Sequence, residues 1–412
     1  MQVKDEKVFC ILPFIHTHLN TDGGIYPCCV GWTTDNRTKV GQLGEQTLEE
    51  AFNSNEMKEL RLDLMNGNRN YKFCEACYER EDNGFPSARI GNNNDFKDRQ
   101  ENILQNLNSD GSMNPVIKSW DIRYSNLCNL KCRSCGDLYS TKWAAETGSN
   151  TELKAFPAGQ DPLVDQYDNV EKIYFAGGEP LIMPEHFETL TKLIASGRSK
   201  KVALVYNSNM TKLNYNKHDL LEYWKEFKTV TVGMSIDAIG DRAEYIRNGV
   251  KWKTIENNLK KFSEFVKNHN TISFYYSPTI SLMSVYTLTD THKYLYNSGY
   301  MKSINDVLFN MLIYPTHLQM GLLPDNIKSE IINKIENHKI WLKENNANNE
   351  IIQQFENLKE FLNKKVDNKA LYEFVHFTKK LDDTRDENFS KTFPELASWW
   401  EKINNNIIFV GG

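Results

Sequence analysis

Short apolar runs and longer amphipathic stretches alternate along the middle of the chain. From residue 116 onward, runs rich in β-branched residues recur, and each is followed by a stretch with helical periodicity. This alternation predicts βαβ units and a parallel sheet. Six such units predict an α/β fold with an open or partial (β/α)6 barrel. The predicted strands are 117–124, 172–175, 202–206, 230–236, 272–276 and 307–314, and the predicted helices include 185–195, 218–228, 253–267 and 290–297.

Polar and glycine-rich segments follow the predicted strands. In an open or closed α/β barrel, ligands bind where loops leave the carboxyl ends of the strands. We therefore expect these segments to share one rim of the barrel and to form its ligand site. In strand order they are 128–135, 177–180, 207–209, Ser235 with Asp237, 277–278 and 314–317.

The regions that flank this alternation have different patterns. Residues 91–115 are polar and rich in Asn and Asp, with a helical segment near 103–107, and we interpret them as a connection between two domains. After residue 320 the pattern is helical, and a helical extension packed on the barrel is favoured over a dedicated partner-binding module. The predicted domains are a small Cys-rich domain at 1–90, the connection at 91–115, the barrel at 116–320 and the helical C-terminal extension at 321–412.

Composition excludes several classes of protein. The 412 residues are 40% hydrophobic and 25% charged, which is typical of a folded protein rather than a disordered one. A net charge of −5 does not indicate nucleic-acid binding, and no apolar run is long enough to span a membrane. The N-terminal residues lack the apolar core of a secretion signal, so we expect a cytoplasmic protein in a reducing compartment.

Three of the eight cysteines lie in one loop. Cys128, Cys132 and Cys135 have the spacing C-x-x-x-C-x-x-C, and thiolates are soft ligands that suit iron–sulfur clusters and zinc. Three thiolates can hold three irons of a 4Fe–4S cluster and leave the fourth iron open to another ligand. A structural zinc would need a fourth ligand that this loop does not supply.

Together with Gly177-Gly178-Glu179-Pro180 one βα unit later, this loop resembles the radical S-adenosylmethionine (SAM) superfamily over about residues 116–320. The resemblance implies that the three cysteines bind a 4Fe–4S cluster and that SAM chelates its open iron. It implies reductive cleavage of SAM to a 5′-deoxyadenosyl radical, which takes a hydrogen atom from a substrate. The SAM-binding residues that it implies are Gly177, Gly178, Glu179 and Pro180 at the amino group, Ser235 and Asp237 near the ribose, and Arg247 at the carboxylate. Asn209 lies where a polar residue often contacts SAM.

Each of these residues also has an ordinary structural interpretation. The glycine pair alone fits a tight turn, Asp237 alone fits a helix N-cap, and Arg247 alone fits a surface ion pair. Their order and their shared rim favour the SAM site over the separate interpretations. One position departs from the family pattern, because Ser134 stands where a large apolar residue usually packs near adenine.

The other five cysteines indicate a second metal site. Cys10, Cys28, Cys74 and Cys77 follow the pattern C-x12-G-x4-C and then C-x-x-C, which resembles the SPASM and twitch auxiliary-cluster domains. That domain usually follows the barrel, whereas here it precedes it, and five cysteines imply one auxiliary 4Fe–4S cluster rather than two. Structural zinc remains the main alternative. Cys29 satisfies the same spacing as Cys28, and we favour Cys28.

Two histidines lie between Cys10 and Cys28. His16 and His18 could serve as metal ligands, but we expect them to have no metal role. A cluster with four protein ligands cannot bind substrate, so the auxiliary cluster would transfer electrons.

The resemblance suggests an enzyme that modifies a peptide or protein by oxidation, crosslinking or epimerisation. The alternatives are a radical SAM enzyme for a small molecule, nucleotide or tRNA, and a non-enzymatic iron–sulfur or zinc scaffold or sensor. A reductant such as flavodoxin or ferredoxin is implied, and no membrane or nucleic-acid partner is indicated. No catalytic acid or base is identified. The rim residues expected to face the substrate are Tyr276, Asn310, Tyr314 and His317, with core packing or loop capping as the alternative for each.

Overall fold

A single eight-stranded sheet forms the centre of the computed structural model, which describes residues 2–31, 39–149, 151–157 and 160–408. The strand order is β10-β9-β6-β5-β4-β1-β2-β3; neighbours from β10 to β1 are parallel, and β1-β2-β3 are antiparallel. The predicted α/β architecture is confirmed. The strands are β1 His16–Leu19, β2 Gly24–Tyr26, β3 Gly41–Gln42, β4 Ser119–Ile122, β5 Lys172–Phe175, β6 Ala203–Ser208, β9 Thr229–Met234 and β10 Ile272–Tyr276.

The segment 307–314, predicted as the sixth barrel strand, does not form a full strand of the central sheet. It contains only β12 (Asn310–Met311), which pairs in parallel with β11 (Thr279–Ile280) in a separate two-stranded sheet. The Leu308 N–H donates to the Tyr276 carbonyl at 2.9 Å, so the segment meets the central sheet only at the carboxyl end of β10. Pro278 lies between β10 and β11 and has no N–H to donate. One hydrogen bond between the strands is therefore missing, and β10 and β11 do not form one continuous strand.

The sixth parallel strand comes instead from the N-terminal region. Strand β1 pairs in parallel with β4, and His16 lies opposite Ser119 while Leu19 lies opposite Ile122. The Cys-rich region and the barrel therefore share one sheet. Residues 91–115 are largely helical, and Phe96, Ile103 and Leu104 are buried there. The division into domains at 90, 115 and 320 stays a prediction.

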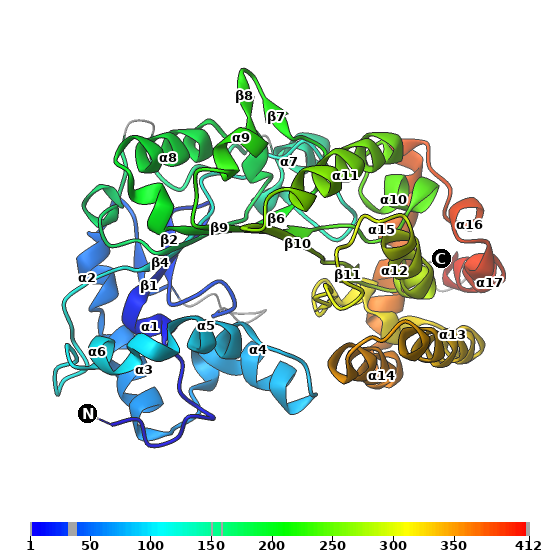
Figure 1. Cartoon of the computed structure of the whole chain (residues 1–412). Coiled ribbons are helices and arrows are strands. Elements are labelled where there is room, and N and C mark those ends of the chain that lie inside the picture. Colours follow the sequence, from blue (N-terminus) through cyan, green and yellow to red (C-terminus); the bar gives the residue numbers. More distant parts are fainter. Residues whose placement is uncertain (1, 32–38, 150, 158–159, 409–412) are drawn as a thin grey trace.

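Helices α8, α9 and α11 cover the convex face of the arched sheet (Figure 1). Trp224 of α9 packs between Tyr206 of β6 and Phe262 of α11, with ring centroids 5.3 and 5.5 Å apart. This aromatic layer holds the helices on the sheet. The predicted helices 185–195, 253–267 and 290–297 are confirmed by α8, α11 and α12, whereas 218–228 is a hairpin followed by a short helix. The elements are β7 Asn214–Tyr215, β8 His218–Asp219, α8 Pro184–Ala195, α9 Leu220–Trp224, α11 Trp252–Lys267 and α12 Leu288–Asn297.

Among the remaining helices, α1 to α6 lie beside and below one end of the sheet, and α10 and α13 to α17 lie around the other end (Figure 1). The predicted helical stretch 327–366 is divided into α13 and α14, and Asn346 between them adopts a left-handed backbone with φ 56°. No helix in the described ranges is both long and apolar enough to cross a membrane. These helices are α1 Leu12–Ile15, α2 Leu48–Phe52, α3 Asn55–Asn66, α4 Tyr71–Asp82, α5 Ala88–Phe96, α6 Gln100–Leu104, α7 Thr141–Thr147, α10 Gly240–Ile246, α13 Asp325–Glu344, α14 Asn349–Asn363, α15 Asn368–Arg385, α16 Phe389–Thr392 and α17 Ala397–Ile408.

Candidate functional site

The cysteine loop, residues 128–135, lies between β4 and α7 at the carboxyl end of the parallel strands. Its three thiols are free and partly exposed. Burial and the neighbouring Cys132 thiol raise the pKa of Cys135 to about 12, and burial with the same neighbour raises the pKa of Cys128 further. Thiols this close disfavour one another's charge, and a bound metal removes that cost because coordination deprotonates the thiol. The donor set therefore fits a cluster held by three cysteines.

The glycine pair packs against this loop. A Cβ on Gly178 would lie 2.1 Å from the Leu127 carbonyl oxygen, and the Glu179 N–H donates to that oxygen at 2.8 Å. Gly177 adopts φ +113°, which favours glycine, and a Cβ there would meet Arg123 at 3.0 Å. The glycines thus let the segment approach the chain's own backbone just before Cys128. Sequence reasoning had instead explained them by close approach to a ligand.

Glu179 lies at the centre of the candidate site and is 2% exposed. Its carboxylate accepts hydrogen bonds from the Asn209 N–H at 2.8 Å, the Ser208 hydroxyl at 3.0 Å and the Leu181 N–H at 3.2 Å. Burial raises the pKa of Glu179 to about 7, although these three donors act to lower it. A carboxylate in this state can pair with an ammonium group.

Asn209 joins the end of β6 to the cysteine loop. Its Nδ2 donates to Asn129 Oδ1 at 3.0 Å, and the Thr211 hydroxyl donates to Asn209 Oδ1 at 2.6 Å. Asn129 Nδ2 in turn donates to the Thr211 hydroxyl at 2.9 Å. The sequence analysis gave no individual role to Asn129, Ser208 or Thr211, although its rim segments 128–135 and 207–209 contain the first two. The position of Asn129 directly after Cys128 was the signal that could have identified it.

Asp237 and Arg247 form one bidentate ion pair. Arg247 donates from Nε and Nη2 to the two Asp237 oxygens, each at 2.9 Å, and its Nη1 lies 4.0 Å from the Cys132 sulfur. Asp237 is 2% exposed and also accepts the Thr279 N–H at 2.8 Å. The structure therefore shows Asp237 orienting Arg247 beside the cysteine loop. Its expected contact with the ribose stays a prediction.

Ser235 and Pro180 complete the residues expected around SAM. Ser235 is partly exposed at the end of β9, and its N–H donates to the Ser208 carbonyl at 2.9 Å. Pro180 is buried and begins a short helical turn whose N-cap is Glu179. Pro180 therefore follows Glu179 directly, whereas Ser235 is hydrogen-bonded to Ser208, whose hydroxyl donates to Glu179.

Four thiols gather in the N-terminal region. Cys74 and Cys77 lie three residues apart on α4, which places them on one side of the helix. Burial and then Cys74 and Cys77 raise the pKa of Cys10. Burial and then Cys29, Cys77, Cys10 and Cys74 raise the pKa of Cys28. In the described part of the chain, no three His, Cys, Asp or Glu side chains are placed to hold a single metal ion together.

Cys29 has different surroundings from Cys28. Burial and then Asp121 raise the pKa of Cys29, and Arg123 opposes them. The Cys29 thiol therefore lies near Asp121 and Arg123 as well as Cys77, whereas the neighbours of the Cys28 thiol are Cys29, Cys77, Cys10 and Cys74. The preference for Cys28 as a ligand stays a prediction.

His16 and His18 contact strand β4. His16 Nδ1 lies 3.0 Å from the Ser119 hydroxyl, and His18 Nδ1 lies 3.1 Å from Asp121. Both rings therefore contact β4 at the junction between β1 and β4, and the expectation that they have no metal role stays a prediction.

Family models match both parts of the chain. Residues 10–78 match the SPASM model, described as an iron–sulfur cluster-binding domain, and residues 122–282 match the radical SAM superfamily model. The chain carries a SPASM domain followed by a radical SAM domain. The prediction of a 4Fe–4S cluster that binds SAM, an auxiliary 4Fe–4S cluster and SAM itself is confirmed at the level of these domains.

The solved structures that match the chain include three with S-adenosylmethionine (AdoMet) bound. A structure described as native anSMEcpe with bound AdoMet is 19% identical over 55% of this chain and 61% of that chain, with a TM-score of 0.40. A complex of anSMEcpe with AdoMet and the Kp18Cys peptide is 18% identical over 56% and 62%, with a TM-score of 0.39. Streptococcus suis SuiB bound to S-adenosylmethionine is 16% identical over 71% and 64%, with a TM-score of 0.37. The chain thus covers less than two thirds of each of these proteins, and no curated protein matches it.

The expected substrate-facing residues of the radical SAM domain have mixed positions. Tyr276 is fully buried, so core packing holds there and the expectation that it faces the substrate is wrong. Asn310 donates to the Ser277 hydroxyl at 2.9 Å, and the His317 ring packs 4.5 Å from Phe377. Tyr314 is 62% exposed. Tyr276 is buried because it is two residues from Phe274 on β10, and residues two apart on a strand point to the same face. That face is the one that the helices cover.

Proposed function

We propose that this protein reductively cleaves SAM and uses the 5′-deoxyadenosyl radical to abstract a hydrogen atom from a peptide or protein. The observation that carries the proposal is the convergence of Glu179 and Arg247 on the cysteine loop. SAM has an ammonium and a carboxylate group, and a buried carboxylate and a guanidinium are their natural partners. A non-enzymatic scaffold has no need of such a pair.

Each residue of the site has a distinct proposed role. Cys128, Cys132 and Cys135 hold the cluster, which supplies one electron when SAM is bound. Glu179 pairs with the ammonium group of SAM, and Asp237 fixes the guanidinium of Arg247 so that its free edge can meet the SAM carboxylate. Asn209 holds the cysteine loop against β6 through Asn129.

The auxiliary cluster and the substrate are proposed on different grounds. Cys10, Cys28, Cys74 and Cys77 together provide four thiolates, which leaves no open iron, so this cluster transfers electrons. The peptide or protein substrate rests on the resemblance to radical SAM enzymes that carry this auxiliary domain. The redox chemistry calls for a reductant such as flavodoxin or ferredoxin and for a reducing compartment such as the cytoplasm.

The test compares the metal content of variants after anaerobic purification and reconstitution. We expect the wild type to contain two 4Fe–4S clusters and no zinc, and the Cys128→Ala/Cys132→Ala/Cys135→Ala variant to contain one cluster and to lose SAM cleavage completely. The matched control is Cys74→Ala/Cys77→Ala, which should lose the other cluster. An iron content that stays unchanged in the triple variant would contradict the assignment of the SAM cluster to the cysteine loop. One zinc per wild-type chain would show that the N-terminal site is a structural zinc site.

A further inference from the structure

Arg133 connects the cysteine loop to the C-terminal extension. It follows Cys132 directly, its side chain is fully buried, and its Nη2 meets Asp382 at 2.5 Å and Glu387 at 2.6 Å. Both carboxylates come from the end of α15 and the turn that follows it. The Arg133 guanidinium is thus buried between two carboxylates. Removal of the guanidinium, or of both carboxylates, would leave a buried charge without a partner of opposite sign.

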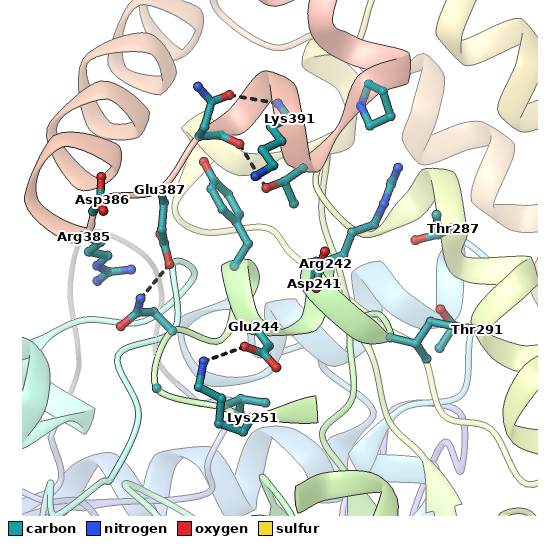
Figure 2. A pocket seen from close by; sticks show the side chains of 18 of the residues that line it. Asp241, Arg242, Glu244, Lys251, Thr287, Thr291, Arg385, Asp386, Glu387 and Lys391 are labelled. Carbon is teal, nitrogen blue, oxygen red and sulfur yellow. Dashed lines mark hydrogen bonds and ion pairs between the residues drawn. The ribbon is translucent and has the colours of Figure 1, made fainter. Parts of the chain in front are cut away.

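The two carboxylates are themselves fixed by α10 and the residues after it. Asp382 accepts hydrogen bonds from the Tyr245 hydroxyl at 2.7 Å and the Phe389 N–H at 2.8 Å. Glu387 accepts from Asn248 Nδ2 at 2.6 Å, and Figure 2 shows this bond beside a hollow of about 860 Å³ lined by α10, α12 and the α15–α16 turn. The Arg133 guanidinium also lies 3.7 Å from the centre of the Tyr245 ring. The cluster is therefore rigid on both sides.

The same segment that holds Arg133 also holds Arg247. Tyr245 and Asn248 flank Arg247 in sequence, and the Arg133 N–H donates to the Ile246 carbonyl at 2.8 Å. A shift of the carboxylates would therefore move both the cysteine loop and the guanidinium that lies 4.0 Å from the Cys132 sulfur.

A second ion pair fixes the far side of the cysteine loop. Arg385 of α15 donates from Nη2 to Glu146 of α7 at 2.6 Å, and its guanidinium lies 4.9 Å from the centre of the Trp143 ring. The Trp143 indole N–H donates to the Cys132 carbonyl at 2.7 Å. The end of α15 thus contacts the cysteine loop directly, through Asp382 and Arg133, and indirectly, through the ion pair between Arg385 and Glu146 of α7.

We infer that the C-terminal extension positions the SAM-cluster loop and lowers the reduction potential of its cluster through the Asp382 and Glu387 carboxylates on Arg133. Against the loop the extension places two carboxylates, Asp382 and Glu387, and one guanidinium of its own, Arg385, so its ion-pair partners add one negative charge there. In a poorly solvated interior that charge disfavours the addition of an electron to the cluster, so the reduced cluster becomes a stronger reductant. This inference rests on the proposed function, since it requires a cluster at Cys128, Cys132 and Cys135.

The experiment measures the midpoint potential of the cluster whose electron paramagnetic resonance (EPR) signal changes when SAM is added. The full-length reconstituted protein is used throughout. Arg133→Met leaves two carboxylates and should lower the potential, whereas Asp382→Asn/Glu387→Gln leaves the cation and should raise it. Shifts of opposite sign support the inference, because a loss of packing alone would not reverse its sign. Equal signs or no shift in either variant would overturn it.

Two further variants separate charge from geometry and from general stability. Arg133→Lys keeps the charge but loses the planar fork, so its potential should stay near that of the wild type while SAM affinity falls about tenfold. Glu395→Gln removes another ion pair between the extension and α10, in which Arg242 donates to Glu395 at 2.6 Å, without touching the cysteine loop. It should change neither the potential nor the EPR signal, and a shift as large as that of Asp382→Asn/Glu387→Gln would overturn the inference.

The outcome for the proposed function is read separately. A wild-type protein with no SAM-dependent EPR change would contradict the proposed function itself. A wild-type protein that shows the change, with variants that leave the potential in place, would contradict only the role of the C-terminal extension.

Discussion

The thiols of the cysteine loop lie beside the Glu179 carboxylate and the Arg247 guanidinium, whereas the thiols of Cys10 and Cys28 lie mainly beside other thiols. Glu179, Asp237 and Arg247 all act on the pKa of the loop cysteines. In the N-terminal region, Cys74 and Cys77 are the first neighbours that raise the pKa of Cys10, and the cation that opposes them is Arg89. One site therefore has charged partners available for a zwitterionic ligand, and the other is built from thiols.

This difference teaches how one chain can prepare two clusters for two tasks. A site with three thiols beside a carboxylate and a guanidinium leaves one iron open and offers partners to the molecule that binds there. A site with four gathered thiols leaves no open iron and needs no such partners. We expect the first to bind and cleave SAM and the second to exchange electrons only.

The largest effect that would sharpen this comparison concerns Cys28 and Cys29. If four thiols close the auxiliary site, Cys28→Ser should reduce the iron and sulfide content from two clusters to one, while Cys29→Ser should keep both. The reason is that Cys28 lies near the other three thiols and Cys29 lies near Asp121 and Arg123. Anaerobic iron and sulfide analysis of the two single variants decides between them. The reverse pattern would show that Cys29, and not Cys28, is the fourth ligand of the auxiliary cluster.

A smaller effect is expected from the contact between the glycine pair and the cysteine loop. In Gly178→Ala, the new Cβ would lie 2.1 Å from the Leu127 carbonyl oxygen, so the two segments must separate. We expect SAM affinity to fall about a hundredfold, and the free energy of unfolding to fall by about 1–3 kcal/mol. Isothermal titration and thermal unfolding measure both quantities. Gly136→Ala is the matched control, because nothing lies within 4 Å of its Cβ. Equal behaviour of the two variants would show that this contact does not shape the site.

The smallest effect is the pH dependence of SAM binding through Glu179. The carboxylate form pairs with the ammonium group, and the pKa of Glu179 is raised to about 7. SAM affinity should therefore be level above about pH 7 and fall about tenfold for each pH unit below it. Titrations between pH 5.5 and about pH 8.5 test this with anaerobic protein. Glu179→Gln should bind weakly and without that slope, and a wild-type affinity that rises as the pH falls would contradict the role of Glu179.

Sequence pattern predicted the parallel sheet well and its two ends poorly. Strands β5 and β10 and helices α8 and α11 agree with the apolar periodicity, because each buries a regular face that its own residues encode. The ends depend on pairing between distant segments. Strand β1 joins β4 across about a hundred residues, and Pro278 interrupts the pairing of the last strand.

The same limit applies to the candidate site. Cys128 to Cys135 and Gly177 to Pro180 were recognisable because their spacing is local, and the structure brings them into contact. The pairing of Asp237 with Arg247 is less evident from sequence, since the chain gives their types but not their orientation. The sequence left both a rim position and core packing open for Tyr276, because a tyrosine at a strand end fits a rim and a core equally well.

By itself, the sequence determined which chemistry the chain can perform. The cysteine spacing and the Gly-Gly-Glu-Pro segment each lie within a few consecutive residues, so both can be recognised from the sequence. The tertiary structure alone decided that the Cys28 thiol lies near Cys10, Cys74 and Cys77, and that Arg133 meets Asp382, which is 249 residues away in the chain. Such contacts depend on how helices and strands pack, and no local pattern records which distant side chain will meet a buried charge.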